Sequence, residues 1–121
     1  MMENMNMIFT DITDNMLQAE MKITKILTNP IGFLHGGASA AFAESIASAA
    51  ANLTIDQEHY IALGAHISAD HLKPVKVGQS IKGHATALHI GKKTQVWKVN
   101  ILHNDKLVCF AKMSAAIVLK K

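Results

Sequence analysis

Glu44 is the one acidic residue in the most apolar stretch of the chain, HGGASAAFAESIASAAANL, which runs from His35 to Leu53. An unpaired carboxylate is costly to place among apolar groups, so Glu44 requires a partner or a chemical role. Two interpretations are open. The alanines could pack against another subunit with Glu44 paired to a lysine there, or Glu44 could line a substrate crevice as a nucleophile or general base.

The glycines that precede this stretch suggest a second chemical group. His35, Gly36 and Gly37 lie where a helix is expected to start, so backbone N–H groups there lack intrahelical partners. Gly36 has no side chain to obstruct a ligand. N–H donors at the positive end of a helix dipole suit a developing oxyanion. The glycines could also simply turn the chain, but an acid on the same helix favours a site.

One long helix positions these groups, and it is expected from Ala38 to about Leu53. The larger side chains form one stripe that is expected to face a sheet, namely Phe42, Ile46, Ala49 and Leu53. The opposite face carries Glu44 together with small residues, namely Ala40, Ala47, Ser48 and Ala51.

Alternating or apolar runs predict strands around this helix, over residues 16–24, 60–72, 79–89, 94–103 and 107–119. One helix followed by an antiparallel meander indicates an α+β fold, with the helix packed on one face of a curved sheet of about five to six strands. A length of 121 residues predicts a single domain over 1–121.

Composition excludes several other classes. The basic residues are all lysines, with no arginine and no basic run interleaved with aromatics, which argues against nucleic acid. No segment is apolar and long enough to cross a membrane. The single cysteine, Cys109, excludes an internal disulfide and is expected to be a small buried hydrophobe. With no secretory signal recognised, we expect a cytoplasmic protein.

Metal and serine chemistry are not expected either. The seven histidines include no pair at helical metal-binding spacing, so we predict no catalytic metal. None of Ser39, Ser45 and Ser48 lies in a G-x-S-x-G elbow.

The HGG at a helix start, with an acid nine positions after the histidine, resembles the hotdog-fold acyl-CoA thioesterases. The most similar group is the 4-hydroxybenzoyl-CoA-thioesterase-like branch, which includes phenylacetate-pathway and 1,4-dihydroxy-2-naphthoyl-CoA thioesterases. Three segments carry the resemblance in order along the chain: NPIGFLHGGASAAFAES, HISADHLKPVKVG and HIGKKTQVWKVNI.

This resemblance implies a role for each matching residue. Glu44 would attack the thioester carbonyl or activate water, and the Gly36 N–H would polarise that carbonyl. His35 would shape the site, Ser48 would hold the water or the carboxylate, and Asn29 stands where such enzymes commonly have a glutamine. Gly37, Ser68 and His71 would contact the substrate along the acyl and pantetheine crevice. No cofactor is implied, because coenzyme A is part of the substrate.

Spacing also predicts a dimer. Gly36 and Glu44 are eight residues apart, about 12 Å along a helix axis, whereas a thioester carbonyl must lie near both groups. Two antiparallel helices from two chains would bring Gly36 of one close to Glu44 of the other. The resemblance adds that hotdog proteins form such homodimers and often pair again into homotetramers.

Lysines are expected to contact the phosphates of coenzyme A. The candidates are Lys92 and Lys93, with Lys73 and Lys76 behind them.

Two other functions remain as alternatives to an acyl-CoA thioesterase. One is a non-catalytic hotdog protein that binds acyl-CoA, although Glu44 would lower its affinity. The other is an acyl-thioester dehydratase or hydratase, which the position of HGG at the helix start disfavours. The acyl group stays open among a naphthoyl, a phenylacetyl-type and a medium-chain fatty acyl thioester.

Overall fold

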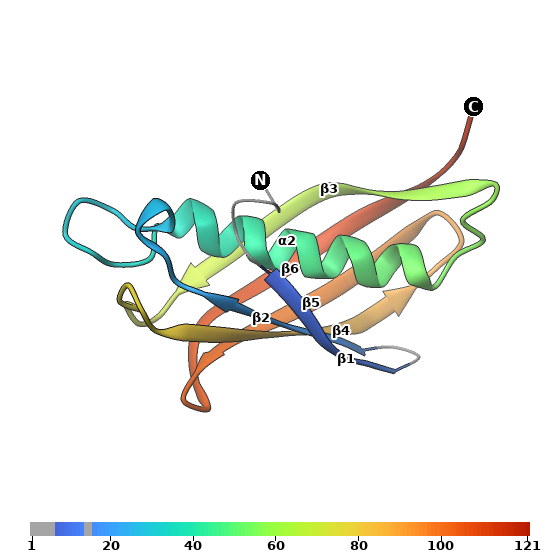
Figure 1. Ribbon diagram of the computed structural model, residues 1–121. Helices are drawn as coiled ribbons and strands as arrows, with labels where there is room; N and C mark the ends of the chain where they lie inside the picture. The colour runs from blue at the N-terminus through green and yellow to red at the C-terminus, as the bar shows by residue number, and fades with distance from the viewer. Residues whose placement is uncertain (1–6, 14–15) are drawn as a thin grey trace.

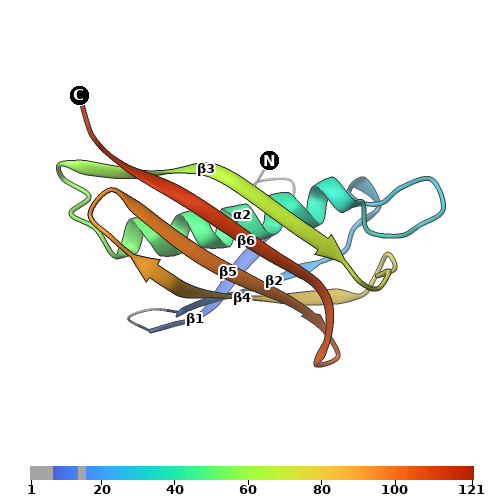
Figure 2. The ribbon, with the colours of Figure 1, turned by 180° about the vertical axis from the view of Figure 1, so that it is seen from behind.

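The computed structural model describes residues 7–13 and 16–121. One long helix, α2 (Gly36–Leu53), lies across the concave side of a curved sheet, and Figure 2 shows the other side of the sheet without a helix over it. The strands are β1 (Met7–Thr13), β2 (Met16–Lys22), β3 (Tyr60–His71), β4 (Ser80–Ile90), β5 (Thr94–His103) and β6 (Lys106–Leu119). A short 3-10 helix, η1 (Lys25–Leu27), follows β2. All strand pairs are antiparallel, in the order β1-β2-β4-β5-β6-β3 (Figure 1).

The α+β architecture predicted from the sequence is confirmed, and the sheet has six strands among the described residues. The helix begins at Gly36, two residues before the expected start. The first strand, β1, was not expected. It lies at one edge of the sheet and its side chains are mostly exposed, so its sequence lacks the alternation that marks a half-buried strand.

The buried face of α2 differs from the predicted stripe. Ala47 and Ala51 are fully buried, whereas Leu53 is 53% exposed. The reason is that the curved sheet covers more than one ridge of the helix and approaches it closely. At Gly83 of β4, for example, an added Cβ would overlap the Cδ1 methyl of Ile46. Two of the alanines assigned to the face of Glu44 therefore pack inside their own chain.

A buried polar pair fixes the C-terminal end of α2 on β5. The Trp97 indole Nε1 donates to Gln95 Oε1 at 2.8 Å, and Gln95 Nε2 donates to Thr54 Oγ1 at 2.8 Å. Gln95 is fully buried, and buried polar groups are stable only when paired in this way. These hydrogen bonds fix the position of α2 relative to the sheet, and with it the positions of Gly36 and Glu44 on the helix.

Within the described ranges, no helix has the length and apolar character needed to cross a membrane.

Candidate active site

The N-terminal end of α2 presents a free backbone donor. His35 caps the helix in an extended conformation, and its Nδ1 accepts a hydrogen bond from the Gly37 N–H at 3.0 Å. The His35 carbonyl accepts from the N–H groups of Ala38 and Ser39. Among the described residues, the Gly36 N–H makes no hydrogen bond. Gly36 can therefore donate to a ligand at the positive end of the helix dipole, while the Gly37 N–H is already engaged.

A cavity of about 410 Å³ opens beside this donor and brings three predicted site residues together: Asn29, Gly36 and His71. The His71 ring faces Gly36 so closely that a Cβ on the glycine would lie 3.2 Å from His71 Nε2. A larger residue at position 36 would narrow the approach to the N–H group. Glycine therefore leaves the space between this N–H group and the His71 ring open.

Asn29 organises the loop that leads into the helix. Its Oδ1 accepts from the N–H groups of Ile31 at 3.2 Å and Phe33 at 3.1 Å. Two backbone bonds fasten the end of this loop, from His35 N to the Leu27 carbonyl and from Leu34 N to the Val75 carbonyl. The amide oxygen of Asn29 is therefore used within the loop. Its amide nitrogen is the part of the side chain that could bind a substrate.

Glu44 lies further along α2 and does not line this cavity. It is exposed in the single chain and packs against β3, where a Cβ on Gly64 would lie 3.3 Å from Glu44 Oε2. Ser48, one turn on, donates from Oγ to Met113 Sδ at 3.5 Å. The helix is regular between Gly36 and Glu44, so the two groups stand about 12 Å apart along its axis.

Gly64 contacts Glu44 and was not among the residues predicted from the sequence. It lies next to a bulge in β3, between Gly64 and His66, and leaves room for the Glu44 carboxylate. An isolated glycine inside a strand pattern is itself a signal of a bulge or of close approach, and that signal was present in the sequence.

For the thioester hydrolysis that the family resemblance implies, we expect Gly64→Ala to lower kcat about tenfold while KM changes little, because the new methyl displaces the carboxylate rather than the substrate. Steady-state thiol release measures both constants. Ala65→Ser, at the exposed neighbouring position, is the matched control and is expected to keep wild-type values. Equal kcat in Gly64→Ala and wild type would contradict this role for Gly64.

The structure separates Ser68 from His71. Ser68 pairs with Lys112 of β6, and His71 pairs with Cys109 of β6. The side chains of Lys112 and Cys109 lie on opposite faces of the sheet. Cys109 belongs to the face that packs on the helix, so Ser68 projects from the outer face. Within one chain, Ser68 is not part of the cavity beside Gly36.

The lysine candidates divide between the two ends of the helix. Lys92 and Lys93 lie in the turn between β4 and β5, at the end of the molecule where α2 finishes (Figure 1). Lys73 lines the cavity beside Gly36. The backbone of Lys76 pairs with that of Phe33, which lies in the loop that leads into α2. Of the four candidates, Lys73 is thus the one that lines the cavity of the free N–H donor in a single chain.

Cys109 is buried, as the sequence predicted, and is 2% exposed. Burial raises the pKa of its thiol, and the nearby Asp70 carboxylate raises this pKa further. The thiol is therefore protonated at neutral pH and is a poor nucleophile.

The described residues hold one cluster that could ligate a metal ion, formed by Asp56, Glu58 and His59. All three are exposed in the segment after α2, away from Gly36. A hydrogen bond from His59 to Asp56 lowers the pKa of that carboxyl group. This cluster does not contact the candidate active site.

Comparison with known proteins identifies the family. The model of the thioesterase superfamily matches residues 31–110. The chain is 35% identical to the proofreading thioesterase EntH of Cronobacter sakazakii over 98% of this chain and 85% of that protein. It is also 35% identical to the 1,4-dihydroxy-2-naphthoyl-CoA hydrolase of Escherichia coli, over 91% of this chain and 80% of that protein.

Solved structures of thioesterases also share this fold. A mutant thioesterase from Pseudomonas aeruginosa superposes with a TM-score of 0.94 at 32% identity, covering 98% of this chain and 86% of that one. A thioesterase from Haemophilus influenzae superposes with a TM-score of 0.91 at 29% identity, covering 98% and 82%.

One long helix on the concave side of a six-stranded antiparallel sheet, with these structural neighbours, defines a hotdog-fold thioester hydrolase. The chain belongs to the thioesterase superfamily.

Proposed function

We propose that this protein hydrolyses acyl-CoA thioesters to a free acid and coenzyme A, at a site completed by two chains. The observation that carries the proposal is the placement of two complementary groups on one helix. A free N–H donor lies at Gly36 and a carboxylate at Glu44, about 12 Å apart along the axis. One thioester carbonyl cannot contact both groups of a single chain, but Gly36 of one chain and Glu44 of another could flank it.

The exposed edge of the sheet supports this pairing. β3 is the last strand on its side and bonds only to β6 within the described sheet, so its other edge is free to pair with a second copy. Glu44 packs beside this strand at Gly64. Antiparallel pairing of two β3 strands would set the two helices antiparallel, with each Glu44 near the join. A homodimer is therefore the minimum assembly of the proposal, and two dimers would make the homotetramer.

Hydrolysis then follows from groups already in place. The Gly36 N–H and the helix dipole stabilise negative charge on the carbonyl oxygen. Glu44 of the second chain attacks the carbonyl carbon directly or removes a proton from the water that does. The C–S bond breaks and the thiolate of coenzyme A takes up a proton. Where Glu44 attacks directly, the acyl group is left as a mixed anhydride with Glu44, and water hydrolyses this anhydride to the free acid and the original carboxylate. By either route the acid carries one oxygen from water.

Other residues position the substrate. His71 lies against Gly36, Asn29 lines the same cavity, and Ser48 follows Glu44 by one turn. Lys73 and Lys76 are placed for the phosphates of coenzyme A in one chain, and Lys92 and Lys93 would serve a substrate that crosses to the other end of the helix. Coenzyme A thioesters are intracellular metabolites, so the proposal places the protein in the cytoplasm.

Thiol release from a panel of CoA esters tests the proposal. We expect turnover of at least one ester, with free acid and coenzyme A in equal amounts. Binding of CoA esters without turnover would instead support a non-catalytic acyl-CoA-binding protein. Hydration of crotonyl-CoA without thiol release would indicate a hydratase.

A further inference from the structure

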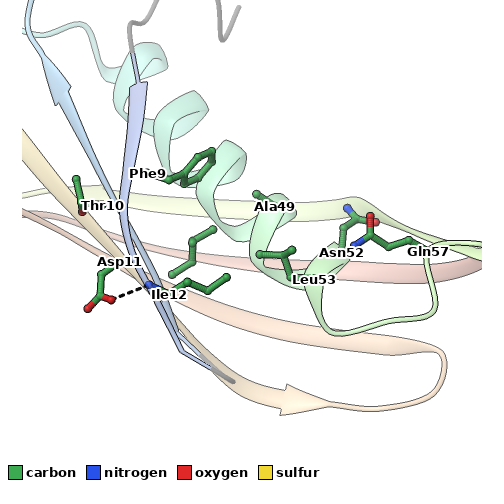
Figure 3. A pocket seen from close by; sticks show the side chains of 9 residues that line it. Phe9, Thr10, Asp11, Ile12, Ala49, Asn52, Leu53 and Gln57 are labelled. Carbon is green, nitrogen blue, oxygen red and sulfur yellow. Dashed lines mark hydrogen bonds between the residues drawn. The ribbon is translucent and has the colours of Figure 1, made fainter.

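The cavities along α2 differ in the polar groups that the helix presents to them. One cavity, of about 680 Å³, lies between β1 and the C-terminal half of α2 (Figure 3). Its polar side chain from the helix is Asn52, whose two amide hydrogens bond to the Ser48 carbonyl at 2.9 Å and the Ala62 carbonyl at 3.2 Å. The helix therefore offers a ligand no free donor there. The cavity beside Gly36, of about 410 Å³, is different, because Ser39 of α2 also lines it.

Ser39 is a buried residue whose hydroxyl is not used by the fold. It is 5% exposed. Among the described residues, its hydroxyl has no hydrogen-bond partner, whereas the hydroxyls of Ser48 and Thr54 each have one. The oxygen is not sealed, since Thr24 Oγ1 is the only buried side-chain oxygen or nitrogen in the described ranges that lacks both a partner and contact with solvent. A buried hydroxyl that is unbonded but open to a cavity is suited to bind a ligand.

The backbone of α2 does not occupy this hydroxyl. A serine inside a helix can donate to the carbonyl four residues earlier, which here is the carbonyl of His35. That carbonyl accepts from the backbone N–H groups of Ala38 at 3.0 Å and Ser39 at 3.1 Å. The Ser39 hydroxyl is not among its described partners, so it remains available to a ligand in the cavity.

Ser39 lies on the same side of the first helical turn as Gly36. The two residues are three positions apart, which makes them neighbours on the helix surface, about 4.5 Å apart along the axis. Helical side chains lean toward the N-terminus, so the Ser39 hydroxyl is directed toward the turn that carries the free Gly36 N–H. A ligand whose oxygen is bonded to that N–H would therefore meet the hydroxyl a few bonds further on.

The charge of the cavity favours the coenzyme A side of a thioester over the acyl side. Lys73 lines the cavity, and none of its lining residues is an aspartate or glutamate. The arm of coenzyme A leads to phosphates, so a lysine and no carboxylate along its path is favourable. Val75 and Val108 supply apolar walls for the methylene groups of such an arm.

We propose that the Ser39 hydroxyl binds the first amide of the pantetheine arm of coenzyme A and so positions the thioester carbonyl at the Gly36 N–H. The inference rests on the proposed function. Two methylene groups separate this amide from the thioester sulfur, so it lies a few bonds beyond a carbonyl bonded at Gly36. A hydroxyl can accept from the amide N–H or donate to the amide oxygen. Ser39 is thus a positioning residue whose effect is independent of the acyl group.

Ser39→Ala tests this inference with three thioesters of one acid: hexanoyl-CoA, hexanoyl-N-acetylcysteamine and S-butyl hexanethioate. The first two carry the amide and the third lacks it. We expect kcat/KM to fall about tenfold for the first two, because one hydrogen bond is lost, and to stay within about twofold of wild type for the butyl ester. The corresponding benzoyl esters should give the same ratios, because their amide is the same.

Ser45→Ala is the matched control, since it makes the same change on the same helix outside the cavity. It should match wild type with every ester. Thermal unfolding detects a structural role, and Ser39→Ala should keep or raise the unfolding temperature because no hydrogen bond within the described chain is lost. Calorimetric titration of coenzyme A alone reads binding without turnover, and Ser39→Ala should bind it about tenfold more weakly than wild type.

The outcomes separate the two proposals. If no ester is hydrolysed but Ser39→Ala weakens binding of coenzyme A, the assignment of Ser39 stands and the hydrolytic function fails. If esters are hydrolysed and Ser39→Ala matches wild type with all of them, the hydrolytic function stands and the assignment fails. An equal loss for the CoA and butyl esters, or a loss that depends on the acyl group alone, would also overturn it. So would a wild-type protein that does not bind coenzyme A.

Discussion

Glu44→Gln is expected to lower kcat/KM for thioester hydrolysis by about two orders of magnitude or more, because the amide can neither attack the carbonyl nor accept a proton from water. The substitution keeps the shape of the side chain. Since Glu44 is exposed in the single chain, no core contact is lost and the protein should fold as wild type does. Thiol release from a turned-over CoA ester measures the effect.

Glu58→Gln is the matched control, because it changes an exposed carboxylate outside the candidate site. It should leave kcat/KM unchanged. Substrate affinity of the Glu44→Gln protein, measured by calorimetry, should remain within a fewfold of wild type. A Glu44→Gln protein with nearly wild-type kcat/KM would contradict a catalytic role for this carboxylate and return it to a structural one.

Gly36→Pro is expected to cost about a hundredfold or more in kcat, the usual loss when one oxyanion donor is removed. Proline lacks the N–H that Gly36 presents, and it is well tolerated at the first position of a helix. The preceding His35 has φ −68 and ψ 136, the extended conformation that a residue before proline prefers. The helix should therefore form normally without the donor.

Gly36→Ala separates loss of the N–H from added bulk. Alanine keeps the donor but places a Cβ 3.2 Å from His71 Nε2, so some loss of activity through crowding is expected. Steady-state kinetics of both variants should show Gly36→Pro to be the less active by at least tenfold. Equal activity of the two would mean that the Gly36 N–H does not stabilise the transition state.

Local patterns in the sequence were sufficient to predict most of the fold. Alternation and turn signals placed five of the strands, and the apolar run placed the helix, which begins at Gly36 rather than at the expected Ala38. The strand β1 was not predicted, because an exposed edge strand has no buried face that requires apolar and polar residues to alternate. The buried face of α2 was partly wrong because side-chain size alone does not indicate that a curved sheet can bury alanines such as Ala47 and expose Leu53.

The part of the candidate site that lies on α2 alone could be placed from the sequence. Gly36, Glu44 and Ser48 share α2, so spacing alone fixed their relation. Contacts between α2 and the strands could not be predicted from spacing along the sequence. The family resemblance put Ser68 and His71 in one crevice, but it did not indicate that only His71 lies against Gly36. The contact of Gly64 with Glu44 depends on a bulge in β3. The same bulge also affects which face of β3 each side chain occupies.

A mixed dimer of Glu44→Gln and Gly36→Pro chains tests most directly whether two chains share each site. Co-expression with two different affinity tags allows the mixed species to be isolated. Each homodimer lacks one group at both sites, whereas a mixed dimer has one site with both groups intact. We predict about half of the wild-type activity for this species, as two-fold symmetry requires. A mixed dimer no more active than the homodimers would contradict the shared site.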